Sequence, residues 1–251
     1  MNNLQGDRPI MEEDTHIEDY LYEIKHAPSD IGWFQCALPQ TAMARLWSYC
    51  EDPEVVDATQ SLAGNLSKSM YLHDKDEWFF KNYIEFMALD YRNSFPDDPL
   101  RFLGARNHEK HPFQLDSLWV NYQRQTEFNP THTHGGVFSF VVFMKIPYHW
   151  ENQHALEHVS RSNSPRAGDF AFEYLSGFGK SRQEIMKMSP EWEGTLLFFP
   201  AEFNHTVYPF YNCNEERITI SGNVGFNTNI ILQTDEEITE RFKAMNKVSY
   251  R

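Results

Sequence analysis

The sequence has little cysteine, and the few cysteines it has are far apart. Among 251 residues there are three, Cys36, Cys50 and Cys213. This number and spacing exclude a disulfide framework and are typical of a protein in a reducing compartment. We therefore expect the protein to be cytoplasmic.

Long apolar runs are also missing. No segment approaches the ~20 consecutive apolar residues that a membrane-spanning helix requires. The first residues, MNNLQGDRPIMEEDTHIEDYLYEIKH, have neither the basic start nor the apolar centre of a signal peptide. The sequence thus predicts no membrane partner, and residues 1–15, which are polar and acidic, are expected to be disordered.

Basic residues are scarce relative to acidic ones. There are 22 Lys and Arg against 36 Asp and Glu, which gives a formal net charge of −14. Such a surface repels a phosphate backbone, and no run of Lys and Arg offsets it. Nucleic acid is therefore not expected as a partner.

Aromatic residues, by contrast, make up 15% of the chain, which favours a sheet-rich core. Two amphipathic helices are expected first, within a helical part at about residues 31–112. One begins with Thr41 as its N-cap and buries Met43, Leu46, Trp47 and Cys50. The other covers about residues 76–91, with Phe80, Ile84, Met87 and Tyr91 on one face.

From residue 113 the apolar pattern changes to that of strands. Alternating or continuous apolar segments occur at residues 118–122, 137–146, 170–172, 195–199 and 217–221. A capping box at residues 234–237 predicts a C-terminal helix over 234–247. Strands joined by turns favour an antiparallel sandwich or barrel. We expect one domain over residues 1–251: a double-stranded β-helix, or cupin-like jelly roll, at about 113–232, with flanking helices.

Two histidines stand two residues apart in the stretch FNPTHTHGG. On a strand, His132 and His134 point to the same side, while Thr133 points away. A third histidine, His205, follows a strand that ends at Pro200. Three such nitrogen ligands suit iron(II), zinc, nickel or copper, although a His-x-His pair alone also occurs by chance. The sequence therefore predicts a metal site formed by His132, His134 and His205.

An arginine follows twelve residues after the third histidine. Arg217, Thr219 and Ser221 share one face of a predicted strand. A guanidinium binds a carboxylate through two parallel hydrogen bonds, and a hydroxyl group adds a third. We expect this face to receive the far carboxylate of a dicarboxylic 2-oxo acid whose near end chelates the metal.

These motifs, in this order, carry a family resemblance. The segments NPTHTHGGVFSFVVF, GTLLFFPAEFNHTVYPF and ERITISGN, within residues 118–223, resemble the iron(II)- and 2-oxoglutarate-dependent oxygenases, prolyl-hydroxylase-like branch. Together with LAGNLSKS at 62–69, they resemble in particular uncharacterised proteins of tailed phages of marine bacteria. A phage origin implies a location in the host cytoplasm.

The resemblance implies a hydroxylase that uses Fe(II), 2-oxoglutarate and dioxygen. It implies that His132 and His205 are metal ligands, that Arg217 and Thr219 bind 2-oxoglutarate, and that Asn121 or Tyr122 contacts it. The chain departs from the family at His134, because the family usually has Asp or Glu there. His134 then either supplies a third nitrogen or stands aside and leaves one ligand missing. Nothing in the spacing favours Glu127 or Glu202 as a substitute.

Several features have two interpretations. Gly135 and Gly136 either let a ligand approach the backbone or form a bulge. His154 and His158 have zinc-site spacing, but their polar surroundings in residues 149–165 favour a loop or a lid. His16, His26, His73, His108 and His111 are expected at the surface.

Two other functions stay open at this stage. One is a cupin-like three-histidine metalloenzyme that does not use 2-oxoglutarate, and the other is a non-catalytic binding protein on the same fold. For a hydroxylase, the resemblance favours a protein side chain such as proline as substrate, with a small metabolite next.

Overall fold

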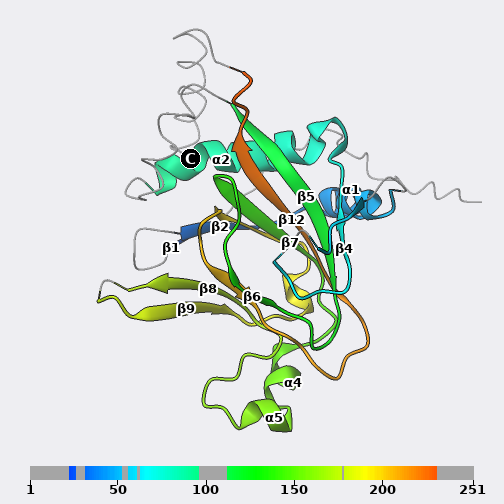
Figure 1. Cartoon of the computed structure of the whole chain (residues 1–251), viewed down its shortest axis with the longest axis vertical. Coiled ribbons are helices and arrows are strands. Elements are labelled where there is room, and N and C mark those ends of the chain that lie inside the picture. Colours follow the sequence, from blue (N-terminus) through cyan, green and yellow to red (C-terminus); the bar gives the residue numbers. More distant parts are fainter. Residues whose placement is uncertain are drawn as a thin grey trace, which may run out of the picture.

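The computed structural model of the protein contains two antiparallel sheets (Figure 1). The structure describes residues 23–26, 32–52, 56–60, 63–95, 112–176 and 178–230. The large sheet has the strand order β1-β2-β10-β7-β12-β5-β4-β3, and the small sheet has the order β6-β11-β8-β9. This architecture confirms the predicted mainly-β jelly-roll class.

The large sheet contains strands from both halves of the chain. They are β1 (Glu23–His26), β2 (Gly32–Ala37), β3 (Val56–Asp57), β4 (Ser69–Tyr71), β5 (Phe113–Gln123), β7 (Phe138–Lys145), β10 (Thr195–Pro200) and β12 (Arg217–Phe226). The small sheet contains β6 (Asn129–His132), β8 (Phe170–Leu175), β9 (Ser181–Met186) and β11 (His205–Val207).

The longer helical segments precede β5. They are α1 (Gln40–Cys50), the 3-10 turn η2 (Lys75–Glu77), the π-helical turn η3 (Phe80–Ile84) and α2 (Glu85–Ser94). Shorter ones follow β7, namely α4 (Trp150–His154), α5 (Glu157–Ser160) and η4 (Pro190–Trp192). Among the described residues, none of the helices has both the length and the apolar composition of a membrane-spanning segment.

The strand β12 is central to the large sheet because it pairs with β5 on one side and β7 on the other. Its register sets Thr219 opposite Asn121 on β5 and opposite Phe143 on β7. One face of these strands packs against the two helices through residues such as Val120, Val142 and Ile220, all fully buried. The other face turns toward the small sheet, and the side chains that alternate with this core point there.

The two apolar clusters explain the layers in Figure 1. The larger cluster lies between the large sheet and helices α1 and α2, where Phe34, Leu46 and Phe198 are buried. The smaller cluster, which includes Phe172 and Phe199, lies between the two sheets. The jelly roll therefore has a helix-covered outer face and an inner face available for a site.

Parts of the predicted N-terminal region differ from the structure. Both predicted helices are present, but the same region also contributes β2, β3 and β4 to the large sheet. Thr41 is not the N-cap of α1, because extended Pro39 occupies that position and Thr41 lies inside the helix. The second helix is interrupted, since Asp76 has a positive φ and a π-helical turn precedes α2.

The β-strands predicted from residue 113 onward are confirmed, and the apolar run at 137–146 forms β7, which is buried on both faces. The predicted helix at 234–247 and the expected disorder of residues 1–15 lie outside the described residues.

Candidate active site

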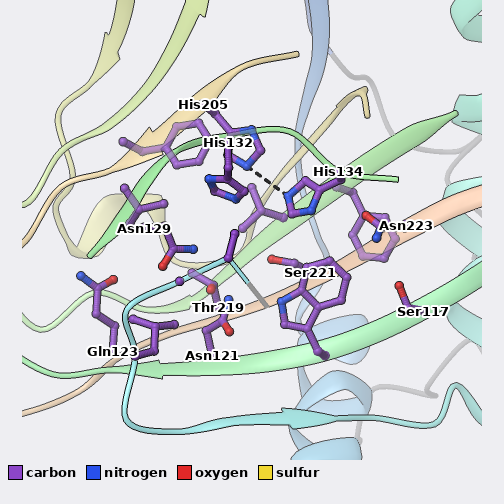
Figure 2. A pocket seen from close by; sticks show the side chains of 18 of the residues that line it. Ser117, Asn121, Gln123, Asn129, His132, His134, His205, Thr219, Ser221 and Asn223 are labelled. Carbon is purple, nitrogen blue, oxygen red and sulfur yellow. Dashed lines mark hydrogen bonds between the residues drawn. The ribbon is translucent and has the colours of Figure 1, made fainter. Parts of the chain in front are cut away.

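A cavity of about 310 Å³ lies between the inner faces of the two sheets. Its lining side chains come from β5, β7 and β12 of the large sheet and from β6, β8 and β11 of the small one (Figure 2). Four alternate residues of β12 face it, and these are Arg217, Thr219, Ser221 and Asn223. The cavity therefore joins the predicted metal-binding and carboxylate-binding residues in one space.

The three predicted histidines converge at one wall of this cavity. Their ring nitrogens lie within 4.8 Å of one another, and they form a group with the composition of a metal site. His205 pairs with His132 across β11 and β6, and His134 Nε2 lies 3.2 Å from His205 Nε2. Figure 2 shows the three rings facing one another. His134 thus joins the other two rather than standing aside.

Backbone carbonyl groups fix the orientation of two of the rings. His132 Nδ1 lies 2.7 Å from the Pro130 oxygen, and His205 Nδ1 lies 3.0 Å from the Phe203 oxygen. A carbonyl oxygen only accepts, so each Nδ1 carries the proton and donates it. Each Nε2 is then left with a lone pair directed at the centre of the cluster, which is the tautomer that a metal ligand requires.

Burial also keeps the imidazoles uncharged. It lowers the pKa of His132, lowers that of His134 to about 4, and holds that of His205 well below its usual value. The neighbouring histidines lower the pKa values of His134 and His205 further. Neutral imidazole is the metal-binding form, so the cluster has the protonation state that coordination requires near pH 7.

The donor set fits a first-row divalent metal. Two imidazole nitrogens at ~2.1 Å from one ion, in adjacent coordination positions, are about 3.0 to 3.4 Å apart. The observed 3.2 Å between His134 Nε2 and His205 Nε2 falls in this range. Converging lone pairs repel one another unless a cation or a proton lies between them, so the arrangement favours a bound metal.

Aromatic rings enclose the cluster. Phe199 and Phe170 lie 5.1 and 5.7 Å from His205 by ring centroid, and Trp119 lies 5.5 Å from His134. His132 and His134 are partly exposed, whereas these buried rings shield His205 from water. Their packing is the physical cause of the low pKa of His205.

Arg217 also lines the cavity and is 2% exposed. No carboxylate of the described residues lies within salt-bridge distance of its guanidinium. Its hydrogen-bond acceptors are all uncharged: Gln123, Tyr148, and the carbonyl groups of Gly168 and Tyr208. A buried cation whose hydrogen-bond acceptors are all neutral makes its part of the cavity attractive to an anion.

Two of these partners were not predicted from the sequence. Gln123 is the last residue of β5 and lies two residues after Asn121, which was predicted as a site residue. Because residues i and i+2 share a strand face, this spacing could have indicated that Gln123 faces the same cavity. Tyr148 comes from the segment after β7, and its hydroxyl donates to the Gly168 oxygen at 2.7 Å. Its sequence context shows nothing that distinguishes it from other aromatic residues, so only the fold reveals it.

The two candidates on β5 lie on opposite faces of the strand. Asn121 lines the cavity and accepts a hydrogen bond from Ser69 at 2.8 Å. Tyr122 points to the helix side, where the ammonium group of Lys68 lies 3.9 Å from its ring centre. Tyr122 is therefore not a cavity residue, because strand alternation gives this position to the helix-covered core.

Other expectations are also resolved by geometry. Gly136 has a φ of 93°, and a Cβ there would lie 2.7 Å from the Val224 oxygen, whereas nothing lies within 4 Å of such an atom at Gly135. Glu127 accepts hydrogen bonds from the backbone of Ser67 and Arg124, and Glu202 is exposed. Neither carboxylate belongs to the histidine cluster.

The remaining histidines do not form a second cluster within the described part of the chain. His154 hydrogen-bonds Asp169 at 3.0 Å, while the ring of His158 packs on Tyr211. The segment at 149–165 is a pair of short helices rather than an irregular loop. His73 is exposed, as predicted. His16, His108 and His111 lie outside the described residues, as does the side chain of His26.

Residues 117–223 match the protein family described as "Putative 2OG-Fe(II) oxygenase". This segment contains the three histidines, Arg217 and most of the cavity lining. The match shows that the jelly-roll part of the chain is similar to the 2OG-Fe(II) oxygenases. This similarity and the histidine cluster support an oxygenase that uses Fe(II), 2-oxoglutarate and dioxygen.

Solved structures with a similar fold include several enzymes of this class. A prolyl-4-hydroxylase of Pseudomonas putida is 17% identical, with a TM-score of 0.42, over 76% of this chain and 91% of that one. The viral collagen prolyl hydroxylase of Paramecium Bursaria Chlorella virus-1 is 12% identical, with a TM-score of 0.40, over 76% and 94%. HygX of Streptomyces hygroscopicus, solved with nickel and 2-oxoglutarate, is 11% identical, with a TM-score of 0.41, over 80% and 85%. The search of curated proteins gave no match.

Proposed function

We propose that this protein is a hydroxylase in which His132, His134 and His205 hold Fe(II) and Arg217 binds the far carboxylate of 2-oxoglutarate. The observation that carries the proposal is the shared cavity, which is lined by three neutral imidazoles and by a buried cation whose hydrogen-bond acceptors are all neutral. Bound Fe(II) supplies the redox chemistry that activates dioxygen. The overall reaction converts a substrate C–H bond, dioxygen and 2-oxoglutarate into C–OH, succinate and carbon dioxide.

The side chains have distinct tasks in this reaction. The guanidinium of Arg217 orients the co-substrate, and Thr219 and Ser221 offer hydroxyl groups along the same face of β12. The carbonyl groups of Pro130 and Phe203 hold the imidazoles in their metal-binding tautomer. The phenylalanine rings around His205 exclude water, which protects a reactive centre from side reactions.

The lining of the cavity also bears on the substrate. Apart from the three histidines, Arg217 is the only side chain in the lining that can carry a charge near neutral pH. Once the co-substrate neutralises it, the remaining surface offers Trp119, Ser117 and Asn223. This surface favours an uncharged substrate group, so a protein side chain such as proline is our first candidate and a small uncharged metabolite the second.

Succinate formation tests this function. Wild-type protein with Fe(II), 2-oxoglutarate, dioxygen and proline-containing peptides is expected to form succinate and a peptide heavier by one oxygen atom. His205→Ala removes a metal ligand and should abolish both products, whereas His73→Ala, at an exposed histidine, should retain them. Undiminished succinate formation by His205→Ala contradicts the assignment of the metal site.

One observation keeps a second function under test. All three ligand candidates are histidines, which suits a cupin-like metalloenzyme that does not use 2-oxoglutarate. The two functions differ in what Arg217 does. Loss of 2-oxoglutarate binding in Arg217→Ala supports the hydroxylase, and unchanged binding supports the alternative.

A further inference from the structure

We propose that Gln123 competes with 2-oxoglutarate for Arg217, so that displacement of its side-chain amide sets the affinity of the site for the co-substrate. The inference rests on the proposed function, because it takes Arg217 as the receiver of the far carboxylate. It adds a residue that controls the strength of that contact.

The first step concerns the donors of Arg217. A guanidinium has five N–H groups, and the side chain can make no further hydrogen bond once each has an acceptor. Nε and Nη2 both donate to Gln123 Oε1, Nη2 also donates to the Tyr208 oxygen, and Nη1 donates to the Tyr148 hydroxyl and the Gly168 oxygen. All five donors are therefore engaged by the protein, and a ligand must displace an existing acceptor.

The second step identifies which acceptor is displaced. Gln123 lines the cavity together with Arg217, whereas Tyr148, Gly168 and Tyr208 do not. The guanidinium edge formed by Nε and Nη2 is thus the edge on the cavity side. A carboxylate binds such an edge through two parallel hydrogen bonds. Gln123 Oε1 already accepts from both nitrogens, so it occupies the position of a carboxylate oxygen.

The third step concerns charge. The amide of Gln123 is neutral, and no carboxylate of the described residues pairs with Arg217. Hydrogen bonds from a cation to an anion are stronger than those to a neutral acceptor. A dicarboxylic co-substrate therefore replaces a weak acceptor by a strong one. Gln123 opposes its own displacement, because its Nε2 donates a hydrogen bond to the backbone carbonyl oxygen of Glu127, which holds the amide in position.

Opposite changes at Gln123 should then have opposite effects on binding. Gln123→Ala leaves two guanidinium donors facing the cavity and should strengthen 2-oxoglutarate binding by about threefold or more. Gln123→Glu places an isosteric carboxylate on Arg217 and should weaken binding by at least about tenfold. A residue with a merely structural role would not give effects of opposite sign.

The experiment is calorimetric titration of 2-oxoglutarate into zinc(II)-loaded full-length protein, because zinc has no redox chemistry and binding is measured apart from turnover. Gln114→Ala is the matched control, since Gln114 lies on the same strand, outside the cavity, and bonds only to exposed Asp116. Thermal unfolding and the zinc content of each variant are recorded alongside. If Gln123→Ala does not fold, Gln123→Ser, which also removes the amide, takes its place.

The outcomes separate the inference from the proposed function. Tighter binding by the Ala or Ser variant and weaker binding by Gln123→Glu support the inference, with Gln114→Ala equal to wild type. Unchanged or weaker binding when the amide is removed overturns it, because Gln123 would then assist the ligand or not affect it. If wild type and all variants fail to bind 2-oxoglutarate while retaining zinc, the proposed function itself is wrong.

Discussion

His134 makes the candidate metal site an all-histidine one. Its Nε2 lies 3.2 Å from that of His205, and burial lowers its pKa to about 4, so it is a neutral imidazole within the cluster. An all-histidine site lacks the negative charge of a carboxylate ligand. It therefore holds a divalent cation less strongly and changes its redox potential.

Substitution of His134 tests whether its imidazole coordinates the metal. If the imidazole coordinates the metal, His134→Ala should weaken Fe(II) or zinc binding by at least about tenfold. The measurement is competition with a metal-sensitive chelating dye under anaerobic conditions. His73→Ala is the control because His73 is exposed and outside the cluster. Equal affinity of wild type and His134→Ala would mean that the ring stands aside.

Part of the site could be predicted from strand periodicity, which places Arg217, Thr219 and Ser221 on one face of β12. Alternation does not explain the histidine pair, because β6 ends at His132, and Thr133, which was predicted to point away, also lines the cavity. The histidine pair, the three β12 residues and His205 all line the cavity. Gln123 and Tyr148 were missed because their role depends on contacts with Arg217 across 94 and 69 positions of sequence.

At the scale of elements, β12 contributes side chains both to the lining of the cavity and to the apolar core. Gly222 lies in its interior, where a Cβ would come within 2.5 Å of the Phe140 ring and 2.8 Å of the Ser117 oxygen. The ring can shift, but the backbone oxygen of the paired strand cannot shift without breaking the sheet register. Close packing of β12 thus depends on a residue without a side chain.

Gly222→Ala should therefore destabilise the protein by about 1 to 3 kcal/mol, since overpacking of a well-packed core costs this much. Chemical denaturation with urea measures the change in the free energy of unfolding. Gly135→Ala is the matched variant, because nothing lies within 4 Å of a Cβ at that position. A loss of stability no larger in Gly222→Ala than in Gly135→Ala contradicts this account of the packing.

The junction of α4 and β8 depends on a buried polar pair. His154 Nε2 lies 3.0 Å from Asp169 Oδ2, and Asp169 is fully buried. Burial raises the pKa of Asp169 from 3.8 to about 7, partly offset by nearby Arg166, Lys187 and Arg217, while burial lowers the pKa of His154. Both shifts favour uncharged partners.

The raised pKa of Asp169 predicts a pH dependence of stability. Between about pH 4 and 7 the folded protein holds a proton on Asp169 that the unfolded chain has lost. The contribution of this group is therefore complete below pH 4 and is lost as the pH rises through 7. Asp169→Asn removes it and leaves His154 in place.

We expect the stability of wild type relative to Asp169→Asn to fall as the pH rises from 5 to 8. Urea unfolding of both proteins at several pH values measures the difference. A difference that stays constant over this range would show that Asp169 has an ordinary pKa.

The elements that sequence analysis missed include β9 and the short strands of the N-terminal region. The six residues of β2 show no long alternation, and their pairing partner β10 is more than 150 positions later. Local patterns identified the helices because a helix satisfies its backbone within itself, whereas a strand depends on a partner that can be distant in the sequence. The phage origin stays a prediction, as does the cytoplasmic location.

For the whole molecule, the candidate metal site lies between the two sheets. His132 and His205 belong to the small sheet, and the cavity that they face is completed by β5, β7 and β12 of the large one. A ligand that binds only the folded protein stabilises it by about 2.7 kcal/mol at a concentration 100 times its Kd. Metal binding should therefore act on the stability of the entire fold.

Thermal unfolding should report this coupling. Saturating zinc(II) should raise the Tm of wild type by about 5 to 10 °C for a chain of this size. The Tm of His205→Ala should change little, while His73→Ala should behave as wild type does. An equal rise in wild type and His205→Ala would place the bound metal elsewhere on the protein.

The central claim is that one cavity binds Fe(II) and 2-oxoglutarate together, and anaerobic visible spectroscopy tests it most directly. We expect a weak charge-transfer band when protein, Fe(II) and 2-oxoglutarate are all present, and no such band when any one of them is left out. Absence of the band in protein that demonstrably holds Fe(II) would contradict the account, and the three-histidine enzyme without 2-oxoglutarate would then be the better description.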